Sequence, residues 1–147
     1  MKKSKYFVMA SMLAAVSILI DVVIKRLIGL QNFGLPFYAI PIVVGSILLG
    51  PVYGVVMSII ADAVGVVLAG QAYLPFFSLA AIFWGLIPGL IIKKKVTHPK
   101  LFAAIIISYL LSSAANTFAI YMHFGSQTAT ATLAARLIFL VANTFIL

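Results

Sequence analysis

The stretch that begins at Gly50 constrains the fold of this chain more than any other. It opens with Gly50-Pro51, a dipeptide that ends one apolar segment and starts the next. Small residues recur at every fourth position, at Gly50, Gly54 and Ser58, and at helical spacing they share one face. Asp62 follows at the same spacing, and a carboxylate inside an apolar helix usually faces the interior of a bundle. The pattern predicts an apolar helix whose small face lets a neighbouring helix approach closely.

The composition around this stretch indicates the class of protein. Of the 147 residues, 65% are hydrophobic and only 8% are charged, and the mean hydropathy is +1.25. A soluble domain could not cover its surface with so few polar residues. We therefore predict an all-α membrane protein, with residues 1–147 forming one domain without internal repeats. The sequence is still apolar at Leu147, so we expect the native chain to continue a little further.

The basic residues predict how the chain lies in the membrane. The net charge is +8, and Lys and Arg gather at the ends of apolar segments, as the positive-inside rule describes. No basic patch is interleaved with aromatic residues, so we expect no nucleic-acid partner. Lys2, Lys3 and Lys5 place the N-terminus in the cytoplasm, and the basic segment 93–100 lies on the same side. The chain is thus expected to be a multi-pass protein of a bacterial plasma membrane.

Glycine and proline turns divide the chain into six apolar segments. The predicted helices span roughly residues 6–28, 37–49, 51–69, 76–92, 101–122 and 132 to the end. The loops 27–37, 70–75 and 123–128 are expected outside the cell, opposite the basic segment. The prediction is a compact bundle of six transmembrane helices with both termini in the cytoplasm.

Few residues are suited to catalysis. The chain has no cysteine, which excludes disulfides and thiolate metal sites. His98 and His123 fall in loops on opposite sides, so they cannot share a site, and His98 is expected to be a solvated loop residue. Two acidic residues are too few for a metal-dependent phosphotransferase, and there is no P-loop or Gly-x-Ser-x-Gly elbow. We predict that the chain is not an enzyme and holds no metal or cofactor.

The first predicted helix carries two local features. Ala10-x-x-x-Ala14 makes a flat strip, which serves either ordinary packing inside the bundle or docking of another membrane subunit. Asp21 and Lys25 are four residues apart, so they can neutralise each other near the outer end of the helix. We expect that pair to be structural.

Arg136 is the most informative single residue. It lies in the outer part of the last predicted helix, against the positive-inside rule. It either reaches the lipid interface, pairs with Asp21 or Asp62, or anchors an anionic solute from outside. The aromatic, amide and cationic residues expected on the outer side form the candidate ligand site: Asn32, Phe33, Tyr38, Gln71, Tyr73, Phe76, Phe77, His123 and Arg136. Such a set suits a planar, amphipathic, anionic molecule.

The central helix carries a recognisable motif. Gly50-Pro51-x-x-Gly54, which runs on to Asp62-x-x-Gly65, resembles the pattern in substrate-binding (S) components of energy-coupling factor (ECF) vitamin transporters. The resemblance covers nearly the whole chain in length and helix count. It implies that these residues are a structural motif of the family.

Two further segments resemble the same family. The Ala10-x-x-x-Ala14 strip is similar to the contact of these proteins with their coupling subunit. The segments 73–81 and 85–90 look most like the folate-type branch. In that branch, Phe-x-Gly-Phe-Thr is usual where residues 74–77 read Leu-Pro-Phe-Phe here.

The resemblance implies a mechanism and partners. An S component captures a vitamin, here folate, from outside without hydrolysing anything. It docks on one membrane coupling subunit and two ATPases, which use ATP, and reorients in the membrane to deliver its ligand. Ser58 stands where a glycine is common, and this departure and the one at 74–77 leave riboflavin, thiamine and pantothenate as alternatives. A ligand-free membrane scaffold protein is the alternative from another class.

Overall fold

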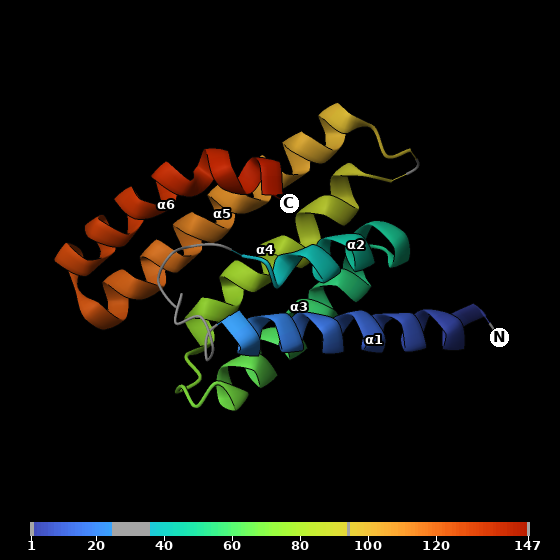
Figure 1. Cartoon of the computed structure of the whole chain (residues 1–147), viewed down its shortest axis with the longest axis horizontal. Helices are drawn as coiled ribbons and strands as arrows, with labels where there is room; N and C mark the ends of the chain where they lie inside the picture. The colour runs from blue at the N-terminus through green and yellow to red at the C-terminus, as the bar shows by residue number, and fades with distance from the viewer. Residues whose placement is uncertain (1, 25–35, 94, 147) are drawn as a thin grey trace.

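The computed structural model describes residues 2–24, 36–93 and 95–146, and all regular elements within these ranges are helices. The helices are α1 (Lys2–Val23), α2 (Ala39–Leu49), α3 (Pro51–Leu68), α4 (Pro75–Ile91), α5 (His98–Phe124) and α6 (Ser126–Ile146). Successive helices run back and forth along the long axis of the molecule (Figure 1). The predicted all-helical bundle is therefore confirmed over the described residues.

The helices have the apolar character that a membrane requires. Three are long and apolar enough to cross a bilayer, over Lys3–Val23, Pro51–Leu68 and His98–Phe124. The shorter apolar helices cover Ala39–Leu49, Pro75–Ile91 and Ser126–Val141. Apolar side chains also cover the outside, where Met12 of α1, for example, is 65% exposed. Such an outer face is suited to lipid or to another membrane protein rather than to water.

The helices α2, α3 and α4 approach one another closely where they meet. Gly54 of α3 and Gly85 of α4 touch backbone to backbone, because a Cβ on either one would run into the other's backbone. Ser46 of α2 lies at the same point: its hydroxyl donates to the Gly85 carbonyl at 2.5 Å and accepts from the Gly89 N–H at 2.9 Å. As the sequence predicted, the small face of α3 admits a neighbouring helix at Gly54.

The turn between α2 and α3 depends on Gly50 and Pro51. Gly50 has a φ of 100°, in the left-handed region where a side chain would be strained. Its N–H bonds to the Ser46 carbonyl at 3.0 Å and closes the end of α2. Pro51 is the first residue of α3, a position at which the missing N–H costs nothing.

The α1 strip is used inside the protein. Ala10 and Ala14 are 8% and 6% exposed, and they pack with Met57 of α3, flanked by Leu13 and Tyr53. Their small side chains allow α1 to lie against α3. The Ala10–Ala14 strip thus contributes to packing inside the bundle, and its docking to a coupling subunit stays a prediction.

The predicted start of the fifth helix needs correction. It begins at His98 rather than near residue 101, because Pro99 occupies the first turn of the helix, where proline is well tolerated. His98 is therefore the first helical residue and not a loop residue, although it is exposed as expected.

The connection to the last helix is also shorter than predicted. Only Gly125 separates α5 from α6, since its φ of 88° turns the chain within one residue. The predicted outer loop 123–128 is therefore largely helical. Thr hydroxyls near the start of α6 bond to carbonyls about one helix turn earlier, as when Thr132 donates to Thr128 at 2.6 Å. The predicted end of the first helix, beyond residue 24, lies outside the described residues.

Candidate ligand-binding site

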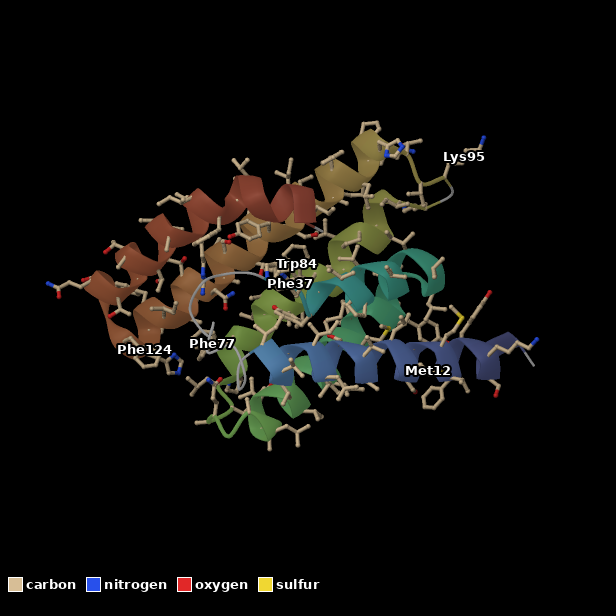
Figure 2. The ribbon with its side chains drawn as sticks, in the orientation of Figure 1. Met12, Phe37, Phe77, Trp84, Lys95 and Phe124 are labelled. Carbon is tan, nitrogen blue, oxygen red and sulfur yellow. The ribbon has the colours of Figure 1, made fainter. Side chains whose placement is uncertain are left out.

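A cavity of approximately 660 Å³ lies between the helices. Residues from α1, α3, α4, α5 and α6 line it, together with the segments that precede α2 and α4. It lies toward the end of the bundle where α3 and α5 finish and α4 and α6 begin, marked by Phe77 and Phe124 in Figure 2. Lys95 lies at the opposite end (Figure 2). The volume is within the range of small-molecule sites, which is about 300–1,000 Å³.

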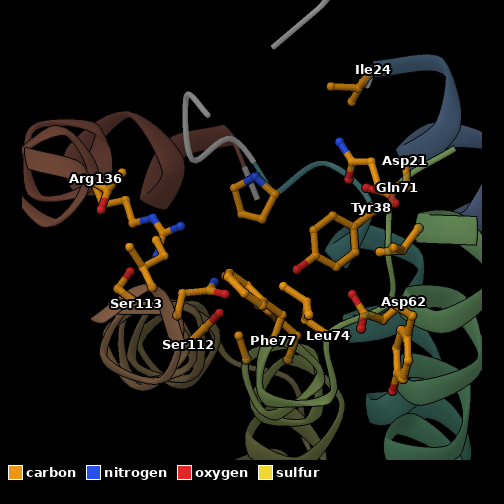
Figure 3. A pocket seen from close by; sticks show the side chains of 18 of the residues that line it. Asp21, Ile24, Tyr38, Asp62, Gln71, Leu74, Phe77, Ser112, Ser113 and Arg136 are labelled. Carbon is orange, nitrogen blue, oxygen red and sulfur yellow. The ribbon is translucent and has the colours of Figure 1, made fainter. Parts of the chain in front are cut away.

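One side of the cavity is cationic. Arg136 of α6 points its guanidinium into the cavity, above Ser112 and Ser113 of α5 (Figure 3). Its Nη1 atom is buried and has no hydrogen-bond partner among the described residues. A buried charged donor without a partner is costly, so this position suits an anionic group of a ligand. A guanidinium can meet a carboxylate with two parallel hydrogen bonds.

The Arg136 backbone is held by a neighbouring aromatic residue. The Tyr109 hydroxyl of α5 donates to the Arg136 carbonyl at 2.8 Å. The Tyr109 ring in turn packs edge-on against Trp84 of α4, at 6.3 Å between ring centroids and 74° between planes. Both rings line the cavity, and Trp84 is only 1% exposed. The packed rings of Tyr109 and Trp84 thus support the cationic side of the cavity.

The other side of the cavity is acidic. Asp62 of α3 accepts a hydrogen bond of 2.7 Å from the Ser78 hydroxyl, which is itself 2.6 Å from the Tyr73 hydroxyl. Asp21 of α1 is 7% exposed and lies against Gly65 of α3, where a Cβ would come within 2.6 Å of its Oδ2 atom. Glycine at position 65 therefore leaves room for the Asp21 carboxylate.

Aromatic side chains also line the cavity. They belong to Tyr38, Tyr73, Phe77, Trp84, Tyr109 and Phe124. In the view of Figure 3, Tyr38 and Phe77 lie between Arg136 and the two aspartates. Rings in this position can stack on a flat ligand or meet its edge.

The structure brings together five of the residues that the sequence nominated for a ligand site. The cavity is lined by Tyr38, Gln71, Tyr73, Phe77 and Arg136. They come from four separate parts of the chain: the segment before α2, the α3–α4 connection, α4 and α6.

Four other nominated residues are not found in the described wall. Phe76 and His123 pack against each other beside the cavity, with ring centroids 5.8 Å apart. The Nδ1 atom of His123 is 2.9 Å from the Ala119 carbonyl of its own helix. Asn32 and Phe33 lie outside the described residues.

Sequence reasoning missed several residues of the wall. It assigned Asp62 to a structural motif and Asp21 to a pair with Lys25, which lies outside the described residues, yet both aspartates line the cavity. It also did not nominate Trp84 or Tyr109. One rule could have identified both aspartates, because a carboxylate in an apolar helix usually faces the interior of the bundle.

Together, the apolar helical bundle and the cavity indicate a small membrane protein with room for a small molecule between its helices. The family model described as "ECF transporter, substrate-specific component" matches residues 5–147. The chain belongs to this family, whose members are substrate-binding subunits of transporters and not enzymes. Such subunits work with a coupling membrane subunit and ATPases. No curated protein and no solved structure matches the chain significantly.

Proposed function

We propose that this chain binds a folate-type vitamin on the outer side of the membrane, for import by an ECF transporter. The observation that carries the proposal is the buried Nη1 atom of Arg136, which has no hydrogen-bond partner among the described residues and belongs to a guanidinium aimed into an aromatic cavity. A planar molecule with a carboxylate would pair with that guanidinium and stack on the rings of Tyr38 and Phe77.

The proposal includes an orientation in the membrane. We infer six membrane spans with the N-terminus and Lys95 on the cytoplasmic side, following the positive-inside rule. The cavity, near the opposite end of the bundle, then faces the outside, where an importer meets its substrate. This arrangement supports capture from outside and delivery by reorientation of the whole bundle on its partners.

The partners follow from family membership, because ECF substrate-specific components work with a coupling membrane subunit and ATPases. We propose one coupling membrane subunit and two ATPases as the complete complex. Family membership and the cavity both favour a ligand-binding subunit over a ligand-free scaffold.

A ligand panel tests the proposal. Trp84 is the only tryptophan and lines the cavity, so its fluorescence reports on the site directly. The purified chain in detergent would be titrated with folate, riboflavin, thiamine and pantothenate, with calorimetry as an independent measurement. We expect tight binding of folate, with quenching of Trp84. Tight binding of another vitamin would contradict the folate type, and no binding of any by folded protein would contradict the proposed site.

A further inference from the structure

The chain has only two acidic residues, and both lie in the wall of the same cavity. Asp21 comes from α1 and Asp62 from α3, so the fold brings together two carboxylates that are 41 positions apart (62 − 21). Burying a carboxylate in an apolar bundle is costly, and such residues usually serve a ligand or an ion. Two negative charges beside one cavity also repel each other, so a positively charged or donor-rich group between them would be favourable.

The structure holds both carboxylates in the wall of the cavity. Ser78, which is 2.6 Å from Tyr73, fixes one oxygen of Asp62 at 2.7 Å. A carboxylate offers about four lone-pair positions, so an orienting hydroxyl is compatible with a further donor from a ligand. The Asp21 carboxylate fits against α3 because Gly65 has no side chain. Both carboxylates can therefore act as acceptors for a ligand in the cavity.

Arg136 lies on the opposite side of the cavity from Asp21 and Asp62 (Figure 3). The cavity is thus polarised, with a cation on α6 facing two anions on α1 and α3. In the view of Figure 3, Tyr38 and Phe77 lie between the two sides, where their rings can contact a flat ligand. Electrostatic complementarity then requires a ligand whose charge is distributed in the reverse order.

We propose that the site recognises a two-ended aromatic ligand: a carboxylate pairs with Arg136, and amino or ring N–H donors at the far end pair with Asp21 and Asp62. This inference rests on the proposed function and narrows its substrate class. A heterocycle with adjacent N–H donors can meet one carboxylate with two parallel hydrogen bonds, as a guanidinium does. Thiamine offers a cation and an amine but no acid, and pantothenate offers an acid but no amine. Asp21 and Asp62 are thereby assigned to specificity.

The test uses the two halves of folate as separate probes. 6-Hydroxymethylpterin carries the donor-rich ring, and p-aminobenzoylglutamate carries the carboxylates. Calorimetry on the purified full chain would compare these probes and folate in Asp21→Asn, Asp62→Asn and Arg136→Gln. The control is Lys95→Gln, which removes one positive charge at the opposite end of the bundle, as Arg136→Gln does in the site.

The expected result is a reciprocal pattern. Asp62→Asn and Asp21→Asn should weaken folate and the pterin by about 10- to 100-fold and leave p-aminobenzoylglutamate nearly unchanged. Arg136→Gln should weaken the binding of p-aminobenzoylglutamate and leave the binding of the pterin nearly unchanged. Lys95→Gln should change the affinity for neither fragment. If both aspartate variants fold and bind folate as the native protein does, the two-ended site is wrong while folate binding stands. If folate does not bind and thiamine or pantothenate binds tightly, the folate type and the two-ended ligand are both wrong.

A competition experiment keeps the inference testable if the variants do not fold. On the native chain, saturating p-aminobenzoylglutamate should leave the affinity for the pterin unchanged, because the two fragments would occupy different ends. Folate should displace both. Mutual displacement of the two fragments would mean that they share one end of the cavity, and would overturn the inference.

Discussion

The hydroxyl of Tyr109 on α5 donates a hydrogen bond of 2.8 Å to the backbone carbonyl of Arg136 on α6. Of the described helices, α6 lies next to α5 alone. The position of Arg136 relative to the acidic side of the cavity therefore depends on how α6 is fixed to α5. Tyr109 is a positioning residue in this sense, since it acts on the guanidinium through the backbone that carries it.

Replacing Tyr109 with Phe tests this positioning role. The ring can still pack on Trp84, whereas the hydroxyl bond is lost, so we expect about 1 kcal/mol of lost stability. Ligand affinity should fall by about three- to tenfold, because Arg136 is less well placed. Calorimetry and thermal unfolding in detergent measure the two effects. The matched control is Tyr121→Phe on the same helix, where the side chain is 57% exposed; equal effects at both positions would rule out a specific role.

Replacing Arg136 itself should lower ligand affinity more than replacing Tyr109 does. We expect Arg136→Ala to weaken an anionic ligand by about 1–3 kcal/mol, because a charged hydrogen bond is lost. Stability should hold or improve, since the Nη1 atom is buried without a partner among the described residues. Loss of stability with unchanged affinity would make the residue structural. The pair of measurements is a binding isotherm and a melting temperature on the same preparation.

Much of the helical framework could be predicted from the sequence because each helix has a local cause. Gly50 ends α2 because its φ of 100° lies in the left-handed region. Pro51 starts α3 because the first turn of a helix does not need the N–H that proline lacks. The short α5–α6 connection could not be predicted in this way. A run of Ser, Thr and Gln after Gly125 has loop composition, yet it is helical in the structure, and its Thr hydroxyls bond to carbonyls of their own helix.

The candidate site was predicted in part, for a physical reason. The sequence nominated residues by loop position, which found Gln71 and Tyr73 and also included Phe76 and His123, which pack beside the cavity. Helix rotation decides which of two adjacent residues faces inward, and the apolar sequence of α4 gives little sign of it. Trp84 was missed for the same reason, as it is one of many apolar residues in that helix.

The helix crossing at Gly54 and Gly85 should be intolerant of any side chain. A Cβ on Gly54 would collide with the Gly85 carbonyl and with Ser46, so α3 and α4 would have to separate. We expect Gly54→Ala and Gly85→Ala to destabilise the protein by at least about 1–3 kcal/mol, the usual cost of overpacking. The yield of monodisperse protein and its melting temperature are the measurements. Ala63→Gly, in the same helix, serves as a control for backbone flexibility alone, and a stable Gly54→Ala protein would contradict the close approach.

Ala14→Trp separates internal packing from partner docking. Ala14 is 6% exposed and packs with Met57, so an indole there would push α1 away from α3. We expect a lower melting temperature and lower ligand affinity in the isolated chain. Met12→Trp, on the exposed face of α1, is the control and should leave both unchanged. A folded Ala14→Trp protein that binds ligand normally but fails in uptake would instead favour docking at this strip.

Phe77 and Phe76 are adjacent in α4 and should behave differently. Phe77 lines the cavity, whereas Phe76 packs with Phe118 and His123 outside the described wall. Phe77→Ala should therefore weaken a flat ligand by about 1–2 kcal/mol through lost ring contact. Phe76→Ala should cost stability by a comparable amount and leave affinity within about twofold, because the ring supports the helix but does not contact ligand. Calorimetry on both variants, with melting temperatures to correct for unfolded protein, distinguishes the two roles. Equal losses of affinity would place the ligand closer to Phe76 and His123 than the cavity indicates.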